Sequence, residues 1–197
     1  VQTIEGFGVV VSPARAEGGA VPSLVALGWE DAVAFIRAAE AEGRPVILQA
    51  GPGARAHTPL PVMGPMLRYL AETAAVPVVT HLDHSRDPAE CAAAIDAGFS
   101  SVMFDGSRMV LDDNIRATAD VVAMGHARGV SVEGEVGFVG YAEGEASART
   151  TPEEARAFAE GTGVDAIAVS VGNVHLQRGP QAQVDLDAVR AIEAVTD

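Results

Sequence analysis

The sequence predicts an α/β fold in which the strands of a parallel sheet alternate with helices. Short apolar runs alternate with amphipathic stretches from about residue 45 onward, which is the pattern of repeated βα units. The apolar runs are nearly continuous, as in strands that are buried on both faces. Glycine and proline separate the segments without any break in composition, so residues 1–197 are expected to form a single domain.

Five segments are predicted to be strands because they are short, apolar and bounded by turn residues. They are Pro45–Ala50, Pro77–Leu82, Ser101–Asp105, Val130–Val136 and Asp165–Val171. The first 28 residues differ in character from the rest of the chain. Gly18, Gly19 and scattered prolines predict a loop there, after a strand at Gly6–Ser12.

Helices are predicted between these strands because the intervening segments carry the start and stop signals of helices. The clearest signal is the sequence Thr-Pro-Glu-Glu at Thr151–Glu154, a capping box with proline at the first helical position. The predicted helices run from Trp29 to Gly43, from Pro88 to Gly98, from Asp112 as the cap to Gly129, from Thr151 onward and from Asp185 onward.

The charge and composition exclude several classes of function. A net charge of −14 would repel nucleic acid and anionic membranes, so neither is an expected partner. The sequence has no long apolar run and no signal-peptide pattern at its start, so no membrane span or leader is expected. The single cysteine, Cys91, favours a reducing, cytoplasmic setting. All thirteen basic residues are arginine, and without lysine the chain cannot form a lysine Schiff base.

Polar side chains gather at the ends of the predicted strands, which is where parallel (β/α) barrels carry out their chemistry. One strand ends in Thr80–His84, and the next ends at Asp105. Glu133 and Glu135 are two residues apart in a strand and therefore share a face. The last strand is followed by Gly172–His175. Histidines and carboxylates thus come to adjacent strand ends, and this combination suits zinc.

Each of these residues also has a structural explanation. Asp105 could merely shape a turn before glycine and serine, and the two glutamates could form a polar layer inside a barrel. We expect His81 to support its neighbours by a hydrogen bond rather than to bind a metal. His57, in a loop, is expected to be structural, and His126, on a polar helix face, is expected to lie at the surface.

The segment Val76–Asp87, with the sequence VPVVTHLDHSRD, resembles the signature segment of the class II fructose- and tagatose-bisphosphate (ketose-bisphosphate) aldolase family. The resemblance continues in order through Cys91–Ser107, Asp112–Thr118, His126–Gly137 and Thr151–His175. It implies a TIM-type (β/α)8 barrel and a zinc-dependent aldehyde-lyase of carbohydrate metabolism, such as glycolysis. That enzyme would reversibly cleave a phosphorylated ketose to dihydroxyacetone phosphate and an aldehyde. A homo-oligomer, dimer or tetramer, is also implied.

The resemblance implies catalytic roles for two carboxylates. Asp83 is similar to the family's acid/base, and Glu143, in the loop Gly137–Ser147, is similar to the glutamate that moves a second proton. The chemistry suits these residue types. Zinc could polarise the substrate's carbonyl in the absence of lysine, while a carboxylate takes the proton from the hydroxyl group at C4.

The resemblance also implies metal and substrate sites. His84 and His175 are similar to two of the family's three zinc-ligating histidines. Asp105 and Glu135 are similar to carboxylates that hold a second or displaced position of the metal, and a second divalent or monovalent cation is compatible with this set. The residues at substrate-binding positions are Gln49, Gly51 and Asn173.

The sequence departs from the family at several positions. Gly51 stands where a substrate-binding serine is usual, and Leu176 stands where a glycine usually follows the ligand histidine. Val25–Gly28 replaces an asparagine-rich segment. The substrate therefore need not be fructose 1,6-bisphosphate.

The length of the chain, 197 residues, is short of the ~250 residues of a typical eight-unit barrel. The family's third histidine ligand, its phosphate loop and two final strands would lie beyond Asp197, so we expect a barrel that is incomplete at its C-terminus. Two other functions stay open: a non-catalytic relative that binds a sugar phosphate, and an unrelated metal-dependent barrel hydrolase.

Overall fold

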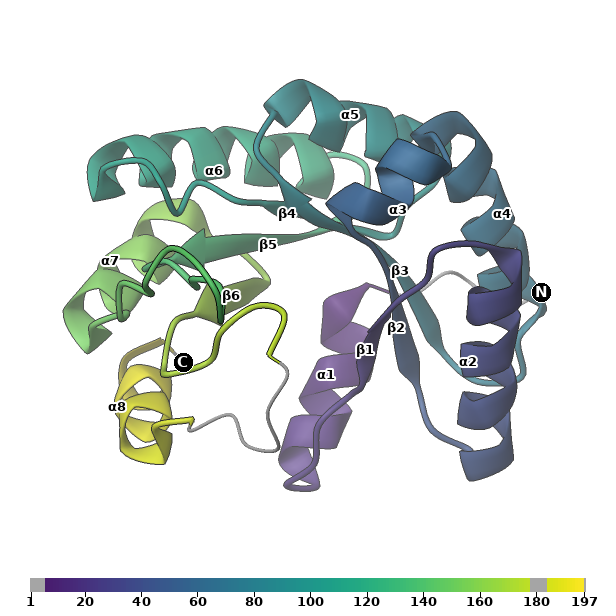
Figure 1. The fold of residues 1–197 in the computed structure, drawn as a ribbon, viewed down its shortest axis with the longest axis horizontal. Helices are drawn as coiled ribbons and strands as arrows, with labels where there is room; N and C mark the ends of the chain where they lie inside the picture. The colour runs from purple at the N-terminus through teal and green to yellow at the C-terminus, as the bar shows by residue number, and fades with distance from the viewer. Residues whose placement is uncertain (1–5, 178–183, 197) are drawn as a thin grey trace. The chain divides into compact units, whose positions relative to one another are not determined.

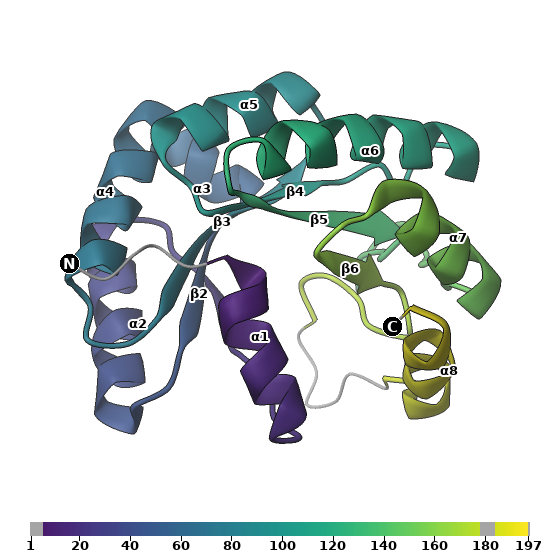
Figure 2. The same ribbon diagram turned by 180° about the vertical axis from the view of Figure 1, so that it is seen from behind.

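The computed structural model describes residues 6–177 and 184–196, in which β-strands alternate with α-helices (Figures 1 and 2). Six strands follow one another in the order β1-β2-β3-β4-β5-β6. Neighbouring strands are parallel wherever their register is described. Parallel neighbours need a crossover connection, and helices provide it here, as in (β/α) barrels. The predicted TIM-type α/β topology is therefore confirmed. None of the helices in the described ranges combines the length and apolar character needed to cross a bilayer.

Contacts between backbone positions divide the chain into two compact units. Unit 1 contains Val1–Phe104 and Ala123–Val132, and unit 2 contains Asp105–Val122 and Glu133–Asp197. The chain passes from one unit to the other at three places: between Phe104 and Asp105, within helix α6 and within strand β5. The single domain expected from the sequence therefore stays a prediction.

Unit 1 is built on strands β1 (Ser23–Val25), β2 (Val46–Ala50), β3 (Val78–Ser85) and β4 (Ser101–Phe104). β2 pairs with β3 along its whole length without a break in register. The pairing of β3 with β4 is different, because the register shifts between Leu82 and Ser85. Asp83 and His84 lie inside this irregular stretch, and a bulge of this kind can turn a side chain toward a site.

The helices of unit 1 are α1 (Phe7–Ala16), α2 (Trp29–Glu42), α3 (Pro52–His57), α4 (Leu60–Thr73) and α5 (Pro88–Ala97). α2, α4 and α5 cover one face of the strands, and α1 lies on the opposite face (Figures 1 and 2). The predicted helix ends at Gly43 and Gly98 are confirmed, since both glycines adopt the left-handed conformation that ends a helix. Helices α3 and α4 were not predicted, and His57 lies in α3 rather than in a loop.

The prediction of a strand at Gly6–Ser12 is wrong, because this segment belongs to helix α1. Phe7 and Val10 are buried, whereas Val9 is 52% exposed. A spacing of three residues between buried positions is that of a helix with one apolar face. The loop predicted for the rest of this region also contains the short strand β1, which pairs with β2.

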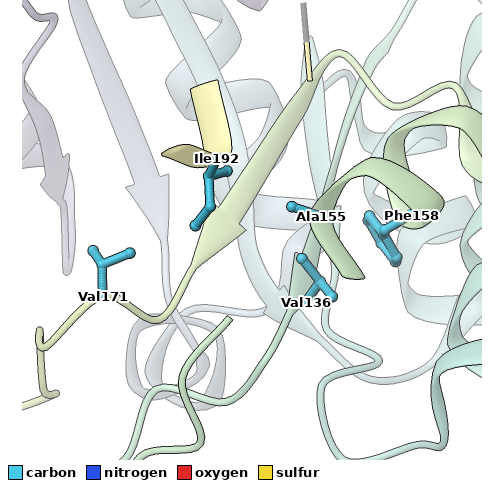
Figure 3. Packing of buried hydrophobic residues seen from close by; sticks show 5 residues of the cluster. All are labelled: Val136, Ala155, Phe158, Val171 and Ile192. Atoms are coloured by element: carbon cyan, nitrogen blue, oxygen red, sulfur yellow. The ribbon is translucent and has the colours of Figure 1, made fainter. Parts of the chain in front are cut away.

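Unit 2 contains helices α7 (Pro152–Thr162) and α8 (Leu186–Thr196), strand β6 (Ala166–Val169), most of strand β5 (Ser131–Val136) and most of helix α6 (Leu111–His126). Its core joins β5, α7 and α8 (Figure 3). The fully buried ring of Phe158 packs there with the buried residues Val136, Ala155, Val171 and Ile192. This cluster anchors the helices against the end of β5.

Two predicted helix starts in unit 2 have different outcomes. The capping box at Thr151 is confirmed, since the Thr151 hydroxyl accepts a hydrogen bond from the Glu154 backbone and the Glu154 side chain accepts one from the Thr151 backbone. The predicted cap at Asp112 is wrong. Helix α6 already begins at Leu111, so Asp112 lies in its first turn. His126, at the end of α6, is exposed as predicted.

Candidate active site

Asp83 and His84 lie at the carboxyl end of β3, in unit 1. His84 has a φ of 50°, in the left-handed region that non-glycine residues rarely adopt. Adjacent residues of a regular strand point to opposite faces, but here the Nε2 atom of His84 lies 4.0 Å from Oδ1 of Asp83. The irregular backbone therefore presents an imidazole and a carboxylate side by side, and both side chains are only partly exposed.

Gln49 in β2 and Gly51 directly after it lie beside the Asp83 carboxylate. The Nε2 atom of Gln49 donates a hydrogen bond of 3.2 Å to Oδ1 of Asp83. Gly51 leaves space beside the other oxygen, since a Cβ atom at this position would lie 3.3 Å from Oδ2 of Asp83. Unit 1 thus brings together four of the predicted site residues: Gln49, Gly51, Asp83 and His84.

His81 precedes this pair in β3 and is fully buried. Its Nδ1 atom shares a hydrogen bond of 2.9 Å with the Ser101 hydroxyl, and its ring lies 5.0 Å from that of Phe7 on α1. Burial, and secondarily the proximity of His84, lower the pKa of His81 to about 3. A neutral, hydrogen-bonded His81 matches the supporting role that was predicted for it.

The guanidinium group of Arg55, a residue outside the predicted site, contacts the same strand ends. Its Nη1 atom donates hydrogen bonds to the main-chain oxygens of Ala50 and Asp83, at 2.7 and 2.6 Å. Nε and Nη2 donate to the Glu90 carboxylate, at 2.9 and 3.0 Å. Only 9% of the Arg55 side chain is exposed. No sequence signal marks this residue, because its partners in the sheet are backbone atoms.

Unit 2 contains two buried carboxylates at strand ends. An oxygen of Asp105 and an oxygen of Glu135 lie within 4.8 Å of one another, and the residues are 5% and 1% exposed. Oδ1 of Asp105 accepts hydrogen bonds from the backbone and the hydroxyl of Ser107, at 3.2 and 2.5 Å. Oε1 of Glu135 accepts one from the Val139 backbone, at 3.2 Å. Two buried carboxylates at this separation repel one another unless a proton or a cation compensates their charge.

Helix α6 supports the strand that carries Glu135. The Nδ2 atom of Asn114 donates a hydrogen bond of 2.8 Å to the main-chain oxygen of Glu135, and the Thr118 hydroxyl donates to Oδ1 of Asn114. Gly134 points away from Glu135 toward the core, since a Cβ atom there would lie 2.7 Å from the ring of Phe158. The alternation predicted for this strand is therefore present. Glu133 is partly buried.

His175 is held by the loop that contains Glu143. The His175 backbone donates to the main-chain oxygen of Gly140 at 2.8 Å, and its own oxygen accepts from Ala142 at 3.1 Å. The ring of His175 lies 5.2 Å from that of Tyr141. The predicted histidine and the exposed loop glutamate, Glu143, are thus carried by adjoining segments of unit 2.

Asn173 shapes the turn after β6, because its Oδ1 atom accepts a hydrogen bond of 2.8 Å from the Val171 backbone. An ion pair also holds the loop that contains Glu143, since Nη2 of Arg108 lies 2.5 Å from Oε2 of Glu145. The predicted metal ligands are divided between the units: His84 belongs to unit 1, and Asp105, Glu135 and His175 belong to unit 2.

Comparisons with known proteins agree on one family. A family model described as "Fructose-bisphosphate aldolase class-II" matches residues 8–196. The 6-phospho-5-dehydro-2-deoxy-D-gluconate aldolase of Shouchella clausii is 37% identical over 196 residues, which are 95% of this chain and 66% of that protein. The fructose-bisphosphate aldolase of Geobacillus stearothermophilus is 42% identical over 156 residues, which are 76% of this chain and 54% of that protein.

A solved structure shows the same similarity. The YdjI aldolase from Escherichia coli K12 superposes with a TM-score of 0.87 at 30% sequence identity, over 98% of this chain and 69% of that one. The chain spans just under two thirds of the length of the Shouchella protein and about half of the Geobacillus protein.

Proposed function

Because the chain belongs to the class-II fructose-bisphosphate aldolase family, we propose that it acts as a zinc-dependent aldolase on a phosphorylated ketose. The reaction would be reversible cleavage to dihydroxyacetone phosphate and an aldehyde. The observation that carries this proposal is the Asp83–His84 pair at the end of β3, with its carboxylate held by Gln49. The two curated relatives have different substrates in their names, so the ketose itself stays open.

We propose His84, Asp105, Glu135 and His175 as the residues that hold the metal. The buried carboxylates of Asp105 and Glu135 support this set, because a cation between them would relieve their repulsion. The connectivity of the chain supports it too, since Asp105 directly follows Phe104, whose Cα pairs with that of Ser85. Imidazole and carboxylate groups together suit zinc. A bound zinc ion would polarise the ketose carbonyl and stabilise the charge that develops when the carbon–carbon bond breaks.

The proton transfers are proposed for the two carboxylates. Asp83 would take the proton from the hydroxyl group at C4 during cleavage and return it in synthesis. The hydrogen bond from Gln49 holds one oxygen of Asp83, and the space at Gly51 lies beside the other. Glu143 would donate the second proton, to the carbon of the triose product. The sequence contains no lysine, so no side chain of this segment can form the alternative Schiff base.

Dependence on a metal tests this function. We expect the full-length protein to cleave at least one ketose bisphosphate, in a screen that couples product formation to the oxidation of NADH. A chelator should abolish this activity, and added zinc should restore it. Borohydride should trap no adduct with the substrate. Full activity after verified removal of the metal would refute the zinc mechanism. Binding of zinc and a sugar phosphate without cleavage would identify the non-catalytic relative. Turnover of phosphate esters that contain no ketone or aldehyde group would identify a hydrolase.

The role of Glu143 has its own test. Replacement of Glu143 by glutamine should slow the exchange of the proton on the reacting carbon of dihydroxyacetone phosphate by about 10²-fold or more, because a positioned acid or base contributes at least that much. Zinc affinity should not change. The exchange can be followed by NMR in deuterium oxide. Glu153→Gln, at an exposed position of α7, is the matched control, and equal exchange rates in Glu143→Gln and wild type would exclude the role.

A further inference from the structure

Arg55 joins the ends of two strands to a helix. From the short helix α3, its guanidinium group reaches the main-chain oxygen of Ala50, the last residue of β2, and that of Asp83 in β3. A longer hydrogen bond of 3.4 Å runs from Nη2 to the main-chain oxygen of His84. On its other side the same group binds both oxygens of Glu90, in the first turn of α5. A planar group with five N–H donors is suited to this task, since it can bind several fixed acceptors at once.

The two main-chain oxygens that Arg55 binds in β3 flank the Cα atom of His84. The φ and ψ angles of a residue describe how the peptide groups on either side of its Cα are turned. Hydrogen bonds to the oxygens of Asp83 and His84 therefore fix both peptide groups that define the conformation of His84. This conformation is left-handed, with a φ of 50°, and such a conformation persists in a non-glycine residue only where the surroundings hold it.

Arg55 binds the sheet where the pairing of its strands is irregular. The register between β3 and β4 shifts between Leu82 and Ser85, so the regular ladder cannot by itself specify the backbone between these residues. Arg55 supplies fixed donors within that irregular stretch. Glu90 compensates the charge of the guanidinium group, whose side chain is only 9% exposed, and orients it by two hydrogen bonds.

We propose that Arg55 is a positioning residue, which holds Asp83 and His84 in the left-handed turn that places their side chains beside each other. The catalytic meaning of this proposal rests on the proposed function, in which Asp83 moves a proton and His84 binds zinc. The hydrogen bonds that Arg55 donates to β3 go to main-chain oxygens. Arg55 acts on the main chain between Asp83 and His84, so it determines the geometry of the proton carrier and of the ligand together.

The test compares substitutions at Arg55 in the full-length protein. Arg55→Lys keeps the charge beside Glu90 but cannot bind the separate acceptors as a planar fork does. We expect a folded protein, checked by circular dichroism, in which zinc affinity and kcat each fall roughly 10- to 100-fold, as is usual for groups that orient metal ligands. Zinc affinity is measured by competition with a chromophoric chelator. Arg68→Lys is the matched control, because Arg68 forms an exposed ion pair with Glu72 in α4 of the same unit, and it should leave both quantities unchanged.

Glu90→Gln provides a second variant if Arg55→Lys does not fold. It leaves Arg55 in place but weakens its orientation, and we expect the same changes in smaller measure. Arg55 could have a purely structural role, in which it only connects the strands to helix α5. In that case the variants will lose thermal stability, while their folded fraction keeps the wild-type zinc affinity and kcat. That outcome overturns the proposal, as do unchanged values in both variants.

A crystal structure of Arg55→Lys separates this proposal from the proposed function. We expect φ of His84 to leave the left-handed region and the distance between the Asp83 and His84 side chains to increase. The positioning role would be overturned if His84 in this variant kept a φ near 50° and its main-chain oxygen did not move. This readout holds even if the wild-type protein cleaves no ketose phosphate, in which case the aldolase function fails and the structural role of Arg55 is still decided.

Discussion

Replacement of Asp83 by alanine is expected to lower kcat for aldol cleavage by about 10²- to 10⁴-fold, which is the usual contribution of a positioned acid or base. The zinc content should stay near that of wild type. The side chain of His84 remains, and Arg55 binds the main-chain oxygen of residue 83, which alanine retains. Initial rates of cleavage and the metal content of the same preparation, measured by atomic emission, check this result.

Two controls make the Asp83 result specific. His84→Ala should instead lose zinc, because it removes a proposed ligand. Asp96 lies in α5, and its side chain is 70% exposed. Asp96→Ala should therefore leave both kcat and zinc content unchanged. Wild-type turnover by Asp83→Ala would show that another group carries the proton.

Replacement of Phe158 by alanine should reduce the free energy of unfolding by about 3–5 kcal/mol, the typical cost of removing a buried aromatic ring. The ring is fully buried in the core of unit 2 and lies over Gly134, where a Cβ atom would come within 2.7 Å of it. Gly134 has no side chain, and the ring of Phe158 occupies the space beside it. When the ring is removed, Gly134 has no side chain that could move into the cavity left behind. The loss of stability can be measured by urea denaturation monitored by circular dichroism, as a lower urea concentration at the midpoint of unfolding.

An exposed apolar residue of the same unit provides the comparison for Phe158. Val110 is 69% exposed, and Val110→Ala should change the free energy of unfolding by no more than about 0.5 kcal/mol. Phe158→Leu keeps most of the apolar volume and should fall between the two. A loss below about 1 kcal/mol in Phe158→Ala would contradict the role of the ring as an anchor, since even deletions of single buried methyl groups reach that range.

The sequence predicted elements well where short-range physics decides them. The helix from Pro88 ends at Gly98 because the left-handed φ of 98° suits a residue without a Cβ atom. The segment Gly6–Ser12 was misassigned because a short apolar run is compatible with a strand or a helix. Its helix becomes evident only from the partner: Phe7 packs on His81, a contact between residues far apart in the chain.

In the candidate site, too, some features could be predicted from the sequence and others depend on contacts between distant residues. The placement of Asp83 and His84 at the end of a strand could be predicted, because parallel strands end at a common edge. The left-handed turn at His84 could not, since non-glycine residues rarely adopt that conformation and no local pattern in the sequence marks this one. Arg55 was missed for a related reason. It recognises main-chain oxygens, which every residue possesses, so only the fold shows which of them lie within reach of its side chain.

The turn after His175 shows that a backbone path can persist when the residue that suits it best is absent. Leu176 has a φ of 54°, in the region that favours glycine, and its side chain is 78% exposed. The neighbouring hydrogen bonds between His175 and the loop at Gly140 and Ala142 fix this path, so the leucine side chain does not determine it. For protein engineering, residue 176 is therefore a position where the side chain beside a proposed ligand can be shortened or removed while the course of the main chain is retained.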